Sequence, residues 1–184
     1  MDTTSPHDPH PLDRPVNSAR LHVIRVLCAA FILFSMIVMI GVVGTVTFAL
    51  GGKALPKNGA LLGGVPILTV IAAVLTMSAV AVGLLVERFL TVRELRAIAT
   101  EPNAEEPQSQ RLLTLYAKIK FTLFALAEGA CVSTAIMYHL SADILMIAFA
   151  AGMTVFMLTQ FPTAKFTRRW YDGAVATVEG MHAP

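Results

Sequence analysis

Four long apolar runs dominate the chain, and polar segments separate them. Together the runs hold 90 residues and a single charged side chain, Glu128, and they cover residues 26–50, 58–86, 121–138 and 144–161. A helix that crosses the hydrocarbon core of a bilayer needs about 20 apolar residues. The runs do not alternate apolar and polar residues as barrel strands do, and backbone groups in lipid must be bonded internally. The pattern therefore predicts transmembrane helices.

The runs divide the chain into a tail, a membrane domain and a second tail. Residues 1–20, rich in proline and aspartate, are expected to be disordered, and residues 163–184 to form a cytoplasmic interfacial tail. Residues 21–162 are expected to form an all-α integral membrane bundle of four transmembrane helices in two antiparallel hairpins, with a cytoplasmic loop at 88–111. The expected spans cover about 22–50, 64–87, 112–139 and 142–161.

Local signals refine some of these boundaries. The first helix is expected to begin near Leu21, with Asn17 or Ser18 as its cap. Residues 87–100 keep a helical period, so they either extend the second span or form a short interfacial helix. Ala79 and Gly83 form a pair of small residues one turn apart, which favours close helix packing.

Positive charges are distributed unevenly between the two sides of the predicted bundle. Twelve arginines and lysines fall before the first span, between the second and third, and after the fourth, against Lys53 and Lys57 between the first two spans. Positive residues concentrate on the cytoplasmic side of membrane proteins. This bias predicts that both termini lie in the cytoplasm, in what we expect to be a bacterial cytoplasmic (inner) membrane.

The composition excludes several classes of function. Only 14% of residues are charged and mean hydropathy is +0.68, which argues against a soluble enzyme or a nucleic-acid-binding protein. The sequence contains no phosphate-binding loop, no zinc-type spacing and no Ser/His/Asp arrangement, so we expect no enzyme activity, no metal and no cofactor. Cys28 and Cys131 both fall inside spans, where they are expected to pack as small apolar residues.

Glu128 is the candidate functional residue. It stands eight residues beyond Lys120, which is roughly 12 Å along a helix and well inside the hydrocarbon. A buried carboxyl is costly in its charged form, and an ionisable residue inside a membrane is by default a functional hypothesis. Its alternative role is structural, as a protonated side chain bonded to a neighbouring helix. In a tight third–fourth hairpin it lies level with Thr154, the first expected partner, and Cys131 shares its helix face.

Two further groups of residues receive predicted roles. Small residues beside Glu128 and on the fourth span are expected to let these two helices pack closely, and they are Gly129, Ser133, Ala148 and Gly152. Basic and aromatic residues after the fourth span are expected to anchor the chain at the membrane interface, and they are Arg168, Arg169, Trp170 and Tyr171.

Two stretches resemble known membrane proteins. Residues 126–130 (LAEGA) resemble the carboxylate helix of ATP synthase subunit c, which implies proton or ion coupling through Glu128. This sequence departs from that family in the glycine-poor second span and the long central loop. The second half of the chain, with the same stretch and the QFPT exit at 160–163, is similar to small uncharacterised bacterial four-span membrane proteins. That resemblance implies a four-span fold and no particular activity.

These observations leave two functional hypotheses. The first is a non-enzymatic structural or accessory subunit whose partners are the lipid bilayer and either further copies of itself or a larger membrane complex, with no nucleic acid. The second is a proton- or ion-coupled membrane component that uses Glu128.

Overall fold

The structure is a computed structural model that describes residues 10–49, 61–62, 65–101, 106–141 and 143–182 of the 184-residue chain. Within these residues almost all of the chain is helical. The five α-helices are α1 (Pro15–Ala49), α2 (Ile67–Thr100), α3 (Gln108–Ser141), α4 (Ile144–Thr159) and α5 (Ala164–His182). A single 3-10 turn (Pro11–Asp13) precedes α1, and a short antiparallel ladder of β1 (Leu61–Leu62) and β2 (Val65–Pro66) precedes α2.

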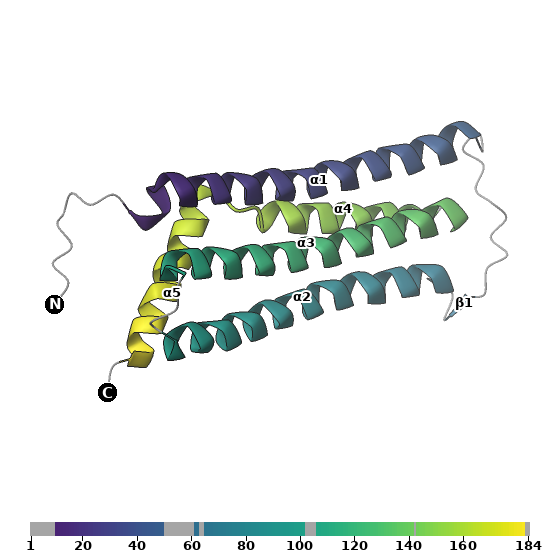
Figure 1. Ribbon diagram of the computed structural model, residues 1–184. Helices are drawn as coiled ribbons and strands as arrows, with labels where there is room; N and C mark the ends of the chain where they lie inside the picture. Colours follow the sequence, from purple (N-terminus) through teal and green to yellow (C-terminus); the bar gives the residue numbers. More distant parts are fainter. Residues whose placement is uncertain (1–9, 50–60, 63–64, 102–105, 142, 183–184) are drawn as a thin grey trace.

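Helix α3 lies in the middle of the bundle. It packs against α1, α2 and α4, while α5 crosses the end of the bundle from which α1 and α3 start (Figure 1). The predicted hairpin of the third and fourth helices is confirmed. The first predicted hairpin is wrong within the described residues, because α1 and α2 lie on different sides of α3 and have little direct contact. Buried residues occur around much of α3, and this gives each neighbour a surface to pack on.

Three helices are long and apolar enough to cross a membrane, namely α1, α2 and α3. A fourth crossing requires α4 and α5 to be counted as one span with a bend of 65°. The 16 residues of α4 reach about 24 Å, somewhat less than the roughly 30 Å of bilayer hydrocarbon. The chain therefore has three to four helices that could span a membrane.

The ordered chain begins earlier than the sequence predicts. Residues 1–9 lie outside the described part, but residues 10–20, expected to be disordered, form the 3-10 turn and the start of α1. Asn17 is inside α1 and donates to the Pro11 carbonyl over 2.7 Å, so it does not cap the helix. Helix α5 supplies the surface that orders this segment, because Arg168 pairs with Asp13 at 2.6 Å.

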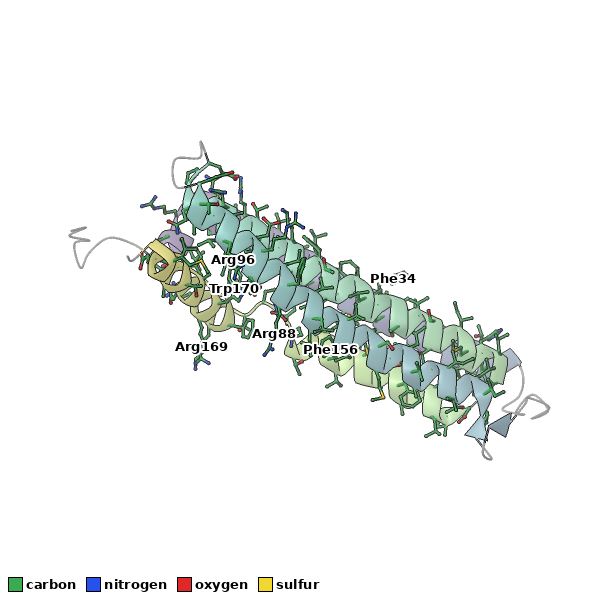
Figure 2. The ribbon with its side chains drawn as sticks, turned by 90° about the horizontal axis from the view of Figure 1, so that it is seen from below. Phe34, Arg88, Arg96, Phe156, Arg169 and Trp170 are labelled. Carbon is green, nitrogen blue, oxygen red and sulfur yellow. The ribbon has the colours of Figure 1, made fainter. Side chains whose placement is uncertain are left out.

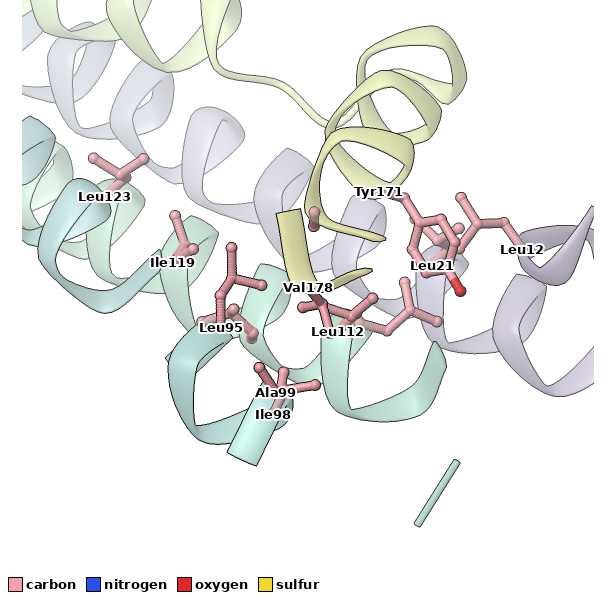
Figure 3. Close-up of a cluster of buried hydrophobic side chains, with 13 residues drawn as sticks. Leu12, Leu21, Leu95, Ile98, Ala99, Leu112, Ile119, Leu123, Tyr171 and Val178 are labelled. Atoms are coloured by element: carbon pink, nitrogen blue, oxygen red, sulfur yellow. The ribbon is translucent and has the colours of Figure 1, made fainter. Parts of the chain in front are cut away.

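Most of the predicted loop at 88–111 is also helical. Helix α2 continues to Thr100 without a break, as one of the two alternatives predicted, and α3 already begins at Gln108. The reason is a cluster of buried apolar residues that joins these helix ends to α5 and the N-terminal segment (Figure 3). Its members include Leu12, Leu95, Ile98, Leu112, Tyr171 and Val178.

Gly83 lies at a tight contact between α2 and α3. It is buried, and a Cβ atom at this position would stand 2.9 Å from Leu123 Cδ2. We expect Gly83→Leu to lower stability by roughly 1–3 kcal/mol, because an overpacked contact forces the helices apart. Gly83→Ala should cost less, since the Leu123 methyl group can move. Thermal unfolding of the purified protein in detergent measures both effects.

Gly152 provides the control for this prediction. A Cβ atom there would meet nothing within 4 Å, so Gly152→Leu should leave the unfolding temperature nearly unchanged. Equal losses for Gly83→Leu and Gly152→Leu would show that the α2–α3 contact is not the cause.

Candidate functional site

Glu128 lies in the middle of α3 and is 8% exposed. Its Oε2 atom accepts a hydrogen bond from Ser35 Oγ, which comes from α1 and is fully buried. Its Oε1 atom is buried and has no hydrogen-bond partner among the described residues. One carboxyl oxygen therefore links two helices, and the other is free to receive a proton or a further partner.

The helical periods of α1 and α3 place this pair. On α3, buried residues recur at Phe124, Ala127, Glu128 and Cys131, and they face the cluster that α3 shares with α1 and α4. On α1, Cys28 is fully buried and stands seven residues before Ser35, which is two helical turns on the same face. The α1–α3 contact thus brings the serine hydroxyl to the carboxyl.

The predicted partners of Glu128 are close to it in the fold but bond elsewhere. Thr154 and Cys131 are both buried, and both donate to the carbonyl oxygen of Ala150. The distance is 3.1 Å from Thr154 Oγ1 and 3.8 Å from Cys131 Sγ. The expectation that Thr154 is the first partner is therefore wrong. Ser35 was not predicted as a partner because α1 was expected to pair with α2. The feature that could have indicated Ser35 is that it is the one serine in the first apolar run.

The predicted small-residue contact between α3 and α4 is wrong. Gly129, Ala148 and Gly152 are exposed, and a Cβ atom at either glycine would meet nothing within 4 Å. Helices α3 and α4 instead meet through buried residues on other faces, such as Cys131 and Met153.

Gly129 and Ser133 line an open apolar groove between α2 and α3. Its volume is about 720 Å³, and no charged side chain lines it. The lining includes Val74, Ser78, Val82 and Ala125. Small residues on this face leave room for another chain or a lipid tail to approach the backbone closely.

Lys120 is a second buried ionisable residue that the sequence did not single out. It is 1% exposed, although the sequence counted it among the positive residues between the second and third spans. Its Nζ atom donates to Gln160 Oε1 over 3.1 Å and lies 4.8 Å from the centre of the Phe166 ring and 5.7 Å from that of Tyr116. An amide oxygen and aromatic faces are suitable neighbours for a desolvated ammonium group. Only the bend into α5 brings Phe166 over this lysine.

An aromatic layer separates Lys120 from Glu128. Phe124 stands between them on the buried face of α3, is fully buried, and packs on Phe31 of α1 with ring centres 6.2 Å apart. Both belong to the apolar cluster of α1, α3 and α4. The two ionisable groups are therefore held at different levels with apolar rings between them.

The four predicted interface anchors divide into two pairs. Tyr171 is buried in the cluster of Figure 3, and Trp170 packs on Tyr116 in a tilted arrangement with ring centres 4.9 Å apart, so both aromatic residues join α5 to the bundle. Arg168 and Arg169 are exposed. The physical reason is the amphipathic period of α5, whose buried stripe is Thr167, Tyr171, Ala174 and Val178.

The described residues contain no group of three or more histidine, cysteine, aspartate or glutamate side chains that could hold a metal ion. Comparison of the chain with protein-family models, curated proteins and solved structures finds no match. The arrangement of Glu128 must therefore be interpreted from its own geometry.

Ser35→Ala should destabilise the bundle by roughly 1 kcal/mol, because interhelical hydrogen bonds in membrane proteins contribute on average about 0.6 and at most about 1.7 kcal/mol. Unfolding in detergent measures the loss. Ser133→Ala is the matched control, since Ser133 makes no hydrogen bond within the described part of the chain. If both variants lost the same stability, the Ser35–Glu128 link would not be the cause.

Proposed function

We propose that this chain is a non-enzymatic multi-pass protein of the bacterial cytoplasmic (inner) membrane that serves as a structural or accessory subunit. The observation that carries the proposal is the way in which the buried Glu128 side chain is bonded. Its carboxyl bonds Ser35 across the α1–α3 contact, and the Phe31–Phe124 layer separates it from Lys120. A carboxyl held in this way links two helices, and the apolar rings of Phe31 and Phe124 lie on its side toward the basic end of the bundle.

The distribution of charge supports an orientation with both termini in the cytoplasm. Eleven of the twelve arginines and lysines of the described residues lie in the first part of α1, the last part of α2, the first part of α3, or α5, and Arg14 directly precedes α1. These segments share one end of the bundle (Figure 1). The positive-inside rule supports a cytoplasmic position for this end, and in the proposed topology α4 together with the bend into α5 makes the fourth crossing.

The outer helix faces support a role in an assembly. Helices α1 and α2 expose large apolar side chains along their length, including Phe34, Ile40, Met77 and Leu85. In a bilayer these faces meet lipid or the helices of a partner, and the groove beside Gly129 offers a small-residue surface for such a helix. The proposed partners are therefore lipid and either further copies of the chain or a larger membrane complex, and not nucleic acid.

Proton or ion coupling through Glu128 is the second candidate function. The observation that favours it is the Oε1 atom, which is buried and lacks a partner among the described residues. A carboxyl with one free oxygen can take up and release a proton, as the resemblance to ATP synthase subunit c implies. The relationship to that family and to small bacterial four-span proteins stays a prediction.

Cysteine labelling tests the orientation. His139 is exposed at the end of α3 and Ala176 on the outer side of α5, so they report the two ends of the bundle. A membrane-impermeant maleimide should label His139→Cys in intact cells, and Ala176→Cys only after permeabilisation. The native cysteines, Cys28 and Cys131, are buried and should give little background. The reverse labelling pattern would overturn the orientation.

Substitution of Glu128 separates the two functions. Glu128→Gln keeps an oxygen that can accept from Ser35, so a structural role predicts normal assembly and stability, whereas Glu128→Leu should lower both. Proton flux into reconstituted vesicles, read with a pH-sensitive dye, should be the same for the wild type and for Glu128→Gln. Flux that Glu128→Gln abolishes and Glu179→Gln leaves intact would instead establish the coupling function; Glu179 is exposed on α5.

A further inference from the structure

Charged residues appear at the same level on α2 and α5. No charged residue stands in 67–86 of α2, and Glu87 and Arg88 follow at once. None stands in 144–164, and Lys165 follows directly after the bend. If the apolar parts lie in hydrocarbon, Arg88 and Lys165 both lie where the lipid headgroups begin.

The outer side of α5 turns its cations away from the bundle. Thr167 and Tyr171 are on the buried stripe, whereas Lys165 and Arg169 are one turn apart on the exposed side. Figure 2 shows Arg88 of α2 and Arg169 of α5 projecting on one side of the molecule, on either side of the start of α5. Helices α2 and α5 also pack on each other. We name Arg88, Lys165 and Arg169 the headgroup patch.

The cations of the headgroup patch have no internal counter-charge. Within the described part of the chain, none of the three side chains makes an ion pair or a hydrogen bond, in contrast to Arg20, Arg111, Lys118 and Arg168. Of the nearby acids, Asp172 contacts His10 Nε2 at 3.0 Å, and Glu87 is half-buried and makes no ion pair among the described residues.

We propose that the headgroup patch binds the phosphate groups of anionic phospholipids in the cytoplasmic leaflet. Arginine presents a planar fork of donors that fits phosphate oxygens, and lysine adds a compact charge. Phe166 is 42% exposed next to Lys165 and offers apolar surface of the kind that interfacial helices bury at the boundary of headgroups and acyl chains. The bend of 65° therefore holds α5 where its outer side meets headgroups and its inner side covers the bundle. The inference rests on the membrane placement proposed above.

Native mass spectrometry of the full-length protein in detergent tests this proposal. The probes are phosphatidylglycerol and phosphatidylcholine with identical acyl chains, so that contacts of the tails cancel and the ratio of bound lipids reports the headgroup. Each cation near an anionic headgroup contributes about 1 kcal/mol, which is roughly fivefold in affinity. The wild type should prefer phosphatidylglycerol, and Arg88→Gln with Arg169→Gln should reduce this preference by roughly 25-fold.

Two matched variants control for charge and folding. Arg14→Gln with Arg93→Gln removes the same charge from exposed residues outside the patch and should retain the preference. Arg88→Lys with Arg169→Lys keeps the charge and should retain most of it. The proposal is overturned if the wild type shows no preference, if both glutamine pairs lose it equally, or if millimolar inorganic phosphate at constant ionic strength displaces the lipid. Because the measurement is made in detergent, it does not depend on the labelling result for orientation.

Discussion

The packing of α3 against three other helices is the constraint on which the rest of the structure depends. In hydrocarbon, apolar burial no longer drives helices together, so association relies on close packing and on hydrogen bonds between helices. Half of the apolar window of α3 is buried, against 17% in α1 and in α2. Gly83 allows α2 to approach, and Ser35 bonds α1 to the same helix. Helices α1 and α2 contact each other little because each packs on α3 from a different side.

Helix α5 completes the structure at the basic end. α4 is short, and the bend after Thr159 directs the chain across the bundle instead of away from it. The inner side of α5 then orders the segment before α1 and the ends of α2 and α3. The same bend places Phe166 over Lys120, so a residue at the edge of an apolar span becomes fully buried. The charged residues on the opposite side of α5 are exposed.

Glu128 is best understood through the cost of its burial. In the proposed membrane placement, an ionised side chain at the centre of a helix would cost about 3 kcal/mol on insertion scales, so a hydrogen-bonded carboxyl is expected there. One oxygen is used by Ser35, and the other is buried without a partner among the described residues. The single hydrogen bond from Ser35 is sufficient to link α1 and α3. On the side of Lys120, the rings of Phe31 and Phe124 pack with their centres 6.2 Å apart in the apolar cluster.

The sequence by itself determined the properties that depend on composition along one segment. Apolar runs identified α1 to α4 but not α5, the charge bias grouped the basic ends of the helices, and Glu128 was visible as the one charge inside a run. Only the tertiary structure decided which helix is central, that Ser35 rather than Thr154 meets Glu128, and that Lys120 and Tyr171 are buried. In apolar helices nearly every face is hydrophobic, so periodicity does not show which face packs on a neighbour and which meets lipid. The face that packs determines which residues of different helices meet. Packing between segments far apart in the chain decides which face that is.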